Sequence, residues 1–459
     1  MAEDRQQAAV DGVATPATDE EVAAAHELLA FVQECPSMFH TAAAIARRLD
    51  AAGFTRLNEG NAWTVAPGSR CYVVRNASSV IAFRVGEDAL DPERFHFQLT
   101  AAHGDSPTFK VKHVPALDGP EGSLRLDVEA YGGMIDYTWF DRPLSLAGRV
   151  LVQVGERVES RLVALEEPVA IIPSLAIHLD RGMNNSFAPN RATDLCPLVS
   201  AGVLAVDDIE RLVAQAADVE PGQVLARDLF LVNRQRPCVW GAAREFVSSP
   251  RLDDLMCAFT SLQAFLAAEN PSAVTVYCCF DNEEVGSNTK QGAMSTLLAD
   301  VLQRLTASLG LTPELYRRAV AKSMLVSCDN AHAVHPNHPE KHDAQNGCRL
   351  NGGLVVKEAA NQHYCTDAFS RAVFTAVCRR AGVPLQTFAN RSDMAGGSTL
   401  GNLSNMQVSM HAVDVGCPQL AMHSAFETAG TRDVTLATRA LQAFFEADVR
   451  ICEADEATI

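Results

Sequence analysis

The sequence has little positive charge for its size and no long hydrophobic run. Its 459 residues include 38 Lys and Arg against 56 Asp and Glu, a formal net charge of −18. Nucleic acids and anionic membranes are bound by basic faces, so this balance argues against both as the main partner. No apolar run approaches the ~20 residues that a membrane-spanning helix needs. We therefore expect neither nucleic acid nor membrane as a partner.

The cysteines lack any pairing pattern. There are 13, an odd number, with no CxxC pair and no regular spacing. Disulfide frameworks are typical of short secreted chains, so this usage favours a reducing compartment and predicts a cytoplasmic protein. The first residues are polar and acidic, without the basic start and apolar segment of a signal peptide. We expect residues 1–17 to form a mobile tail.

Strand and helix patterns alternate over most of the chain and predict an α/β fold. Apolar segments typical of strands occur at 71–85, 95–102 and 273–280. After residue 240 such strands alternate with long helical patterns. This alternation predicts a mixed central sheet with helices on both faces.

The middle of the chain has a different character. Residues 107–239 contain short β-rich runs separated by Gly and Pro signals. The simplest division is one α/β domain in two parts, 18–106 and 240–459, interrupted by a β-rich insert at 107–239.

Histidines and carboxylates gather where the predicted strands and helices end. Asp281, Glu283 and Glu284 follow directly after the strand 273–280. Ligands bind at the carboxyl ends of strands in open α/β sheets. A solvated acidic turn explains this segment alone equally well, but other element ends repeat the pattern. These further residues are His103, Asp105, Asp253, Asp329, His332, His335 and His423.

Mixed His and carboxylate side chains are the ligands of Zn²⁺ and similar divalent ions. Two histidines and three carboxylates can hold two ions if one carboxylate bridges them. Asp105 lies two residues after His103, so it can accept the second ring N–H and orient the ring. In the pair Glu283–Glu284, one glutamate can bind metal while its neighbour acts as a base.

A series of motifs runs in order along the chain: AAHGDSP, YGGMIDYTWFDRPLSLAGRV, SPRLDDL, FDNEEVGS, SCDNAHAVHPN, SDMAGGSTLGN and CPQLAMHS. Together they resemble the aspartyl aminopeptidase family of dinuclear zinc metallopeptidases. The resemblance covers nearly the whole chain after the tail. It implies a zinc-peptidase α/β core with an inserted β-rich dimerisation domain that roofs the site. It also implies a homo-oligomer, a tetrahedral dodecamer, that removes N-terminal Asp or Glu from peptide substrates.

The resemblance implies a role for each clustered residue. The expected cofactors are two divalent ions, Zn²⁺ first, with Mn²⁺ and Co²⁺ as alternatives. One ion is bound by His103 and Asp329, the other by Glu284 and His423, and Asp253 bridges them. Glu283 is the implied general base for a water bound by the two metal ions, and Asp105 completes the catalytic set.

Further residues are implied to contact the substrate. They are His332, Lys357, Tyr364 and, from the insert of a neighbouring subunit, His178. The resemblance also implies a cis peptide bond at Asp253–Asp254. Departures from common relatives, such as HGD for HTD and Ser174 for a histidine, remove no proposed ligand and bear on specificity.

Other functions fit parts of the sequence. An aminopeptidase for neutral N-terminal residues, or another dinuclear metallohydrolase, would use the same ligand set. A non-catalytic structural or binding protein is the third alternative. The complete ligand set argues against it, because such a protein has no need of both Glu283 and Glu284.

Overall fold

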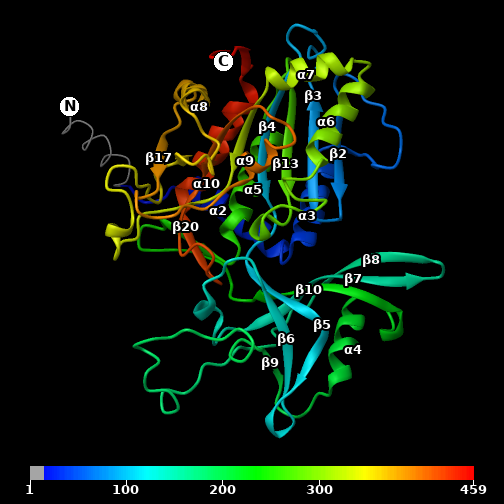
Figure 1. The fold of residues 1–459 in the computed structure, drawn as a ribbon, viewed down its shortest axis with the longest axis vertical. Helices are drawn as coiled ribbons and strands as arrows, with labels where there is room; N and C mark the ends of the chain where they lie inside the picture. Colours follow the sequence, from blue (N-terminus) through cyan, green and yellow to red (C-terminus); the bar gives the residue numbers. More distant parts are fainter. Residues whose placement is uncertain (1–14) are drawn as a thin grey trace.

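The computed structural model describes residues 15–459, which form an α/β unit and a smaller β-rich unit beside it (Figure 1). Most of the predicted tail, residues 1–17, lies outside the described residues. Ala17, at its end, is buried and donates its N–H to the carbonyl of Ala243 at 2.9 Å. Thr18 then caps the first described helix by accepting the N–H of Glu21.

The α/β unit is built on a nine-stranded sheet with the order β1-β2-β3-β13-β4-β14-β18-β16-β17. β4 pairs in parallel with both β13 and β14, whereas β3 and β16 each pair antiparallel with a neighbour, so the sheet is mixed as predicted. The strands are β1 (Thr55–Arg56), β2 (Arg70–Arg75), β3 (Ser79–Val85), β4 (Phe97–His103), β13 (Val274–Phe280), β14 (Met324–Cys328), β16 (Leu354–Glu358), β17 (Leu385–Ala389) and β18 (His411–Gly416).

Helices cover both faces of this sheet, which confirms the predicted fold class. One apolar core joins the sheet to α2 (Asp19–Glu34), α3 (Met38–Ala51), α5 (Leu252–Ala267), α8 (Ala368–Arg380) and α10 (Thr431–Glu446). A second core on the other face joins it to α6 (Leu297–Ser308), α7 (Pro313–Ala321) and α9 (Leu400–Ser404). The central strands are buried on both sides and are therefore continuously apolar.

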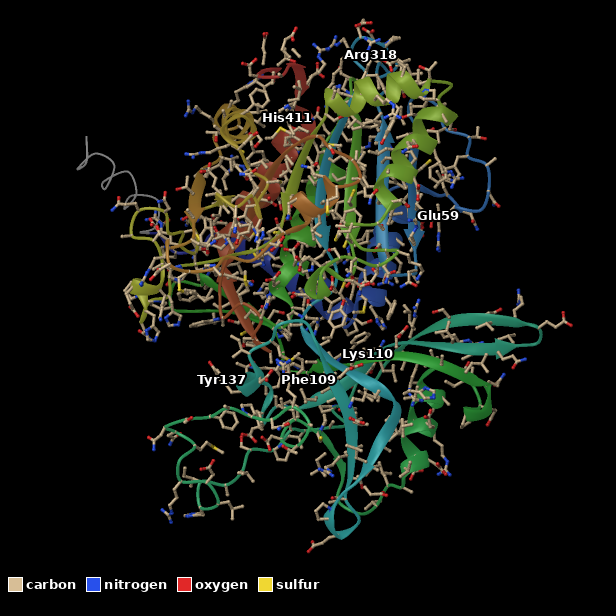
Figure 2. All side chains as sticks on the ribbon, in the orientation of Figure 1. Glu59, Phe109, Lys110, Tyr137, Arg318 and His411 are labelled. Atoms are coloured by element: carbon tan, nitrogen blue, oxygen red, sulfur yellow. The ribbon has the colours of Figure 1, made fainter. Side chains whose placement is uncertain are left out.

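The β-rich unit has its own sheet and its own core. Six antiparallel strands follow the order β8-β7-β10-β5-β6-β9. Phe109 and Lys110, near the start of β5, lie at the junction with the α/β unit (Figure 2). The strands are β5 (Thr108–Asp118), β6 (Leu124–Tyr131), β7 (Leu144–Val154), β8 (Arg157–Ala164), β9 (Leu198–Ser200) and β10 (Val224–Asn233).

One helix of this unit was not expected from its β-rich sequence. It is α4 (Val206–Ala216), which buries Ile209, Val213 and Ala214 against the strands. The spacing of four between Ile209 and Val213 places both side chains on one helix face.

A five-stranded sheet lies next to the carboxyl ends of the central strands, with the order β11-β12-β20-β19-β15. Its β15 follows β14 closely along the chain, and its β19 follows β18, so both strands start near the edge where the central strands end. Its strands are β11 (Cys238–Trp240), β12 (Phe246–Ser249), β15 (Ala331–His332), β19 (Pro418–Leu420) and β20 (Glu427–Gly430).

The chain ends in a hairpin of β21 (Arg450–Glu453) and β22 (Glu456–Thr458). Within residues 15–459, no helix has the length and apolar character needed to cross a membrane.

Candidate metal centre

The site forms where neighbouring strands of the nine-stranded sheet end together. β4 ends at His103, and its parallel neighbours β13 and β14 are followed by Glu283–Glu284 and Asp329. Parallel strands bring their carboxyl ends to one edge of the sheet, which explains why residues distant in sequence meet here. Asp253 comes from the first turn of α5, and its peptide bond to Asp254 is cis, as the resemblance implied.

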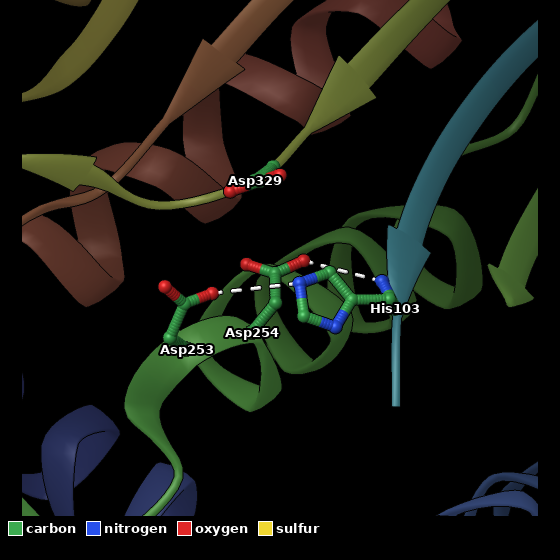
Figure 3. Close-up of side chains that lie close together, drawn as sticks. All are labelled: His103, Asp253, Asp254 and Asp329. Atoms are coloured by element: carbon green, nitrogen blue, oxygen red, sulfur yellow. Dashed lines mark hydrogen bonds and ion pairs between the residues drawn. The ribbon is translucent and has the colours of Figure 1, made fainter. Parts of the chain in front are cut away.

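The first half of the site surrounds the His103 ring (Figure 3). Its Nε2 lies 3.4 Å from Asp253 Oδ1. One ligand atom from each of His103, Asp253, Asp254 and Asp329 fits within 4.8 Å of the others. All four side chains are buried. This grouping of one imidazole and three carboxylates suits a divalent cation.

The second half of the site lies on the other side of Asp253. His423 Nε2 is 3.6 Å from Asp253 Oδ2 and 3.4 Å from Glu284 Oε2. Asp253 therefore directs one carboxylate oxygen towards His103 and the other towards His423. This is the arrangement that a bridging ligand between two ions requires.

The two glutamates of the EE pair occupy different positions. Both have a ligand atom within 4.8 Å of His103, but only Glu284 also groups with Asp253 and His423. Glu283 Oε2 lies 4.0 Å from His103 Nε2, at the rim of the cluster. The side chain of Glu283 is 14% exposed, and that of Glu284 is 3% exposed. Glu283 is thus the one that water and substrate can reach.

Asp105 holds the parts of the site together. Its backbone oxygen is 3.1 Å from His103 Nδ1, and its Oδ1 is 3.4 Å from the same nitrogen. The backbone N–H groups of Glu283 and Glu284 donate to its two carboxylate oxygens at 3.2 Å each. Asp105 can therefore orient the His103 ring, as the HGD spacing suggested, and it also fixes the EE turn.

Two carboxylates that the sequence analysis did not single out complete the site. Glu427 accepts the N–H of Asp253 at 3.0 Å and that of His423 at 2.7 Å. Asp254 accepts the N–H of His103 and of Asn330 at 3.2 Å each. Both carboxylates accept hydrogen bonds from backbone N–H groups, an interaction that leaves no pattern in the sequence. The one available signal was position, since Asp254 follows Asp253 and Glu427 lies four residues after His423.

The buried negative charge of the site calls for a cation. Burial, and then the charge of Asp253, raises the pKa of Glu284 well above its usual range. Burial also raises the pKa of Glu283, to about 8, with Asp329 adding to the effect. Burial lowers the pKa of His103, but its contacts with Asp105 and Asp253 outweigh burial and raise it. A bound cation would compete with protons for these side chains, so metal binding should weaken as the pH falls.

An unsatisfied atom points to the same conclusion. Glu284 Oε1 is buried and has no hydrogen-bond partner among residues 15–459. A buried carboxylate oxygen without a partner is costly, and a bound cation would satisfy it. The residues of the site therefore fit a divalent metal ion.

The residues expected to contact substrate fall into two places. Lys357 Nζ lies 3.5 Å from Asp329 Oδ1 and 5.2 Å from the centre of the Tyr364 ring. The Phe388 ring packs against the rings of both Tyr364 and His332. The structure thus brings His332, Lys357 and Tyr364 together beside the first half of the site. Burial lowers the pKa of His332 to about 4, so this imidazole is neutral near pH 7.

His178 lies elsewhere. It belongs to an exposed loop of the β-rich unit. No hydrogen bond or ion pair joins it to another residue in the described part of the chain. Within one subunit, the structure does not bring it to the metal ligands.

A mixed α/β sheet with this His and carboxylate cluster at its carboxyl edge defines a metallohydrolase. Residues 31–445 match the family model of the aminopeptidase I zinc metalloproteases, M18, and the chain belongs to this family. M18 includes the aspartyl aminopeptidases, so the resemblance found in the motifs is confirmed. The chain is an aminopeptidase that depends on metal to hydrolyse peptides at the N-terminus.

Known proteins support this assignment over the whole chain. A protein of Clostridium novyi named probable M18 family aminopeptidase 2 is 40% identical over 427 residues, which span 92% of this chain and 98% of that protein. The structure of the Ape4 and Nbr1 complex matches with a TM-score of 0.90 and 35% identity over 94% of this chain and 87% of that one. The structure of the S. cerevisiae mApe1 dodecamer matches with a TM-score of 0.82 and 28% identity, over 94% and 97%.

The different positions of the two glutamates lead to a prediction about metal content. Glu284→Gln should lower the amount of zinc bound per chain, because Glu284 groups with Asp253 and His423 as a possible ligand. Glu283→Gln should bind as much zinc per chain as the wild type does. Elemental analysis of both variants after equilibration with zinc and removal of free metal measures this difference. Equal loss of metal in the two variants would contradict the assignment of Glu284 as the ligand.

Proposed function

We propose that the chain is an aminopeptidase with two divalent metal ions and a preference for N-terminal Asp or Glu. The observation that carries the two-ion proposal is the Asp253 carboxylate, with one oxygen directed to each histidine. His103, Asp329 and Asp253 would hold one ion, and Asp253, Glu284 and His423 the other. Zn²⁺ is the proposed metal, because the family is one of zinc metalloproteases.

The two ions would polarise the scissile carbonyl and activate a water molecule when bound. In this proposal Glu283 would take the proton of the attacking water and pass it to the leaving amine. Its carboxylate flanks His103, stays partly exposed and does not group with His423. Asp105 fixes the backbone of Glu283 and so holds the base in position.

We propose that the chain works as a homo-oligomer, as a dodecamer in particular. The loop that carries His178 exposes a run of apolar side chains to solvent. Their exposed fractions are 57% for Leu175, 47% for Ile177, 76% for Leu179 and 40% for Phe187. Large exposed apolar patches mark protein–protein contacts. A neighbouring subunit covering this loop would bring His178, which lies between Ile177 and Leu179, to its own site.

The preference for acidic residues is proposed on electrostatic grounds. A substrate carboxylate that enters a site lined by acidic ligands needs a nearby positive charge. Among His332, Lys357 and Tyr364, His332 is neutral near pH 7, and Asp329 helps to raise the pKa of Lys357 despite its burial, so Lys357 carries the positive charge. Its ammonium donates to the carbonyls of Asp329 and Asn330 at 2.7 and 3.3 Å. An ammonium has three N–H groups, and the third would turn from Asp329 Oδ1, 3.5 Å away, to a substrate carboxylate.

The chemistry is tested first with peptides that differ only in the N-terminal residue. The zinc-loaded protein should hydrolyse Asp- and Glu-terminated peptides with a higher kcat/KM than Ala- or Leu-terminated ones. Activity should disappear with a chelator and return with zinc. N-acetylated peptides, which lack the free amine, should not be cleaved. A preference for Ala or Leu would instead support an aminopeptidase for neutral residues.

The role of Lys357 predicts a change in specificity. Lys357→Met should lower kcat/KM for Glu-terminated peptides by roughly one to two orders of magnitude, because losing a buried charged hydrogen bond costs about 1.5–3 kcal/mol. Ala-terminated peptides should change little. The deciding quantity is the Glu-to-Ala ratio of kcat/KM. If Lys357 only supports Asp329, both substrates will lose activity equally and this ratio will stay constant.

Sharing of His178 predicts that inactive subunits complement each other. His178→Ala and Glu283→Gln should each abolish most turnover in a uniform assembly. Subunits of the two variants, dissociated and reassembled together, should regain part of the activity. In such mixtures some sites combine an intact Glu283 with an intact His178 of the neighbour. A separated monomer as active as the assembly would rule this proposal out.

A further inference from the structure

A segment of the β-rich unit reaches across to the metal centre. Residues 131–138, called the clamp segment here, run from the end of β6 into the short helix Asp136–Trp139. Tyr131 begins it, and its side chain packs edge-on against Phe230 of β10 at 5.5 Å. Tyr131 is therefore anchored in the β-rich unit while its hydroxyl points into the site.

The Tyr131 hydroxyl is tied to the EE turn. It donates to Asp105 Oδ2 at 2.7 Å and accepts from Asn282 Nδ2 at 2.8 Å. The same Asp105 oxygen accepts the backbone N–H of Glu284. Tyr131 and Glu284 thus share one acceptor atom. Without the Tyr131 hydroxyl, Asp105 Oδ2 would lose one of its two hydrogen bonds and would hold the backbone N–H of Glu284 less firmly.

The clamp segment also holds His423. The Gly133 carbonyl is 2.7 Å from His423 Nδ1, and Ile135 N–H donates to the His423 carbonyl at 3.0 Å. The contact with Gly133 fixes the ring so that Nε2 faces Asp253 and Glu284. Ala425 N–H donates to Thr138 Oγ1 at 2.9 Å, which ties the following residues to the same segment.

The backbone of the clamp segment passes close to Glu284. Gly132 has a φ of +82°, and a Cβ added there would lie 3.1 Å from Glu284 Cβ and 3.3 Å from its carbonyl oxygen. Only glycine combines this φ with such a close approach. Of the two ligands that belong to the second half-site alone, His423 is hydrogen-bonded to the clamp segment and Glu284 lies close to it.

The first half-site is supported differently. Asp254 of α5 accepts the N–H of His103, and Asp329 lies beside Lys357 of β16. These supports belong to the α/β unit. Asp105 and Glu427 support both halves, but only the second half-site is also held by the β-rich unit at its own ligands, with Gly133 and Ile135 on His423 and Gly132 close to Glu284.

We infer that the clamp segment controls binding of the second metal ion, with Tyr131 as a positioning residue for Glu284. This inference rests on the proposed two-ion function. When the β-rich unit sits on the α/β unit as in this structure, Glu284 and His423 are held in place. Residues that support metal ligands through hydrogen bonds typically contribute roughly 10- to 100-fold to metal affinity.

The test is a zinc titration of the apoprotein against a competing chelator, with Tyr131→Phe and Tyr137→Phe as a matched pair. Tyr137 lies in the same segment, near the junction of the two units (Figure 2), and is 64% exposed. Tyr131→Phe should weaken one of the two zinc sites, the one at Glu284 and His423, roughly 10- to 100-fold and change the other much less. Its kcat should fall at limiting zinc, with KM nearly unchanged. Tyr137→Phe should match wild type.

A second pair tests the backbone contact. Gly132→Ala should weaken the same zinc site, whereas Gly222→Ala, elsewhere in the β-rich unit, should not, because a Cβ there would meet nothing within 4 Å. This pair decides the question if Tyr131→Phe fails to fold.

The outcomes separate the clamp from the two-ion site itself. Two ions in wild type with unaltered affinities in Tyr131→Phe and Gly132→Ala would overturn the clamp alone. Equal weakening of both zinc sites would also overturn it. A single ion per wild-type chain would overturn both the clamp and the two-ion function.

Discussion

The position of the Asp253 carboxylate is the constraint on which the rest of the site depends. Each of its oxygens faces a different histidine, and it is buried with Glu284, Asp329 and Asp254 around it. Such a concentration of buried acids is unfavourable unless cations and donors balance it. The surrounding backbone is arranged accordingly, and Glu427 fixes both Asp253 and His423 through their N–H groups. Fold and metal binding are therefore linked at one residue.

The place of the β-rich unit in the chain follows from this site. It begins at β5, directly after the strand that ends in His103 and the loop that contains Asp105. It returns at β10 and reaches α5, where Asp253 lies, through β11 and β12. The unit is thus inserted between two elements that carry ligands. From this position it can hold the second half-site through Tyr131 and Gly133 while it also exposes the loop proposed to meet a neighbouring subunit.

The sequence predicted those parts of the site that follow from the ends of strands. His103, Glu284 and Asp329 each follow an apolar strand pattern, and the parallel pairing of β4, β13 and β14 brings them together. Glu427 and Tyr131 escaped notice because they act on the backbone or on another carboxylate, and such contacts have no pattern of their own. The helix α4 was missed because short β-rich runs surround it. His178 stays a prediction, since its proposed partner is in another subunit.

The most direct test of the account is a crystal structure of the zinc-loaded protein with anomalous data collected at the zinc edge. Two anomalous peaks per chain are predicted, both in contact with the Asp253 carboxylate. One peak should lie beside His103 and Asp329, and the other beside Glu284 and His423. A single peak, or two peaks of which one does not touch Asp253, would contradict the bridging role on which the account is built.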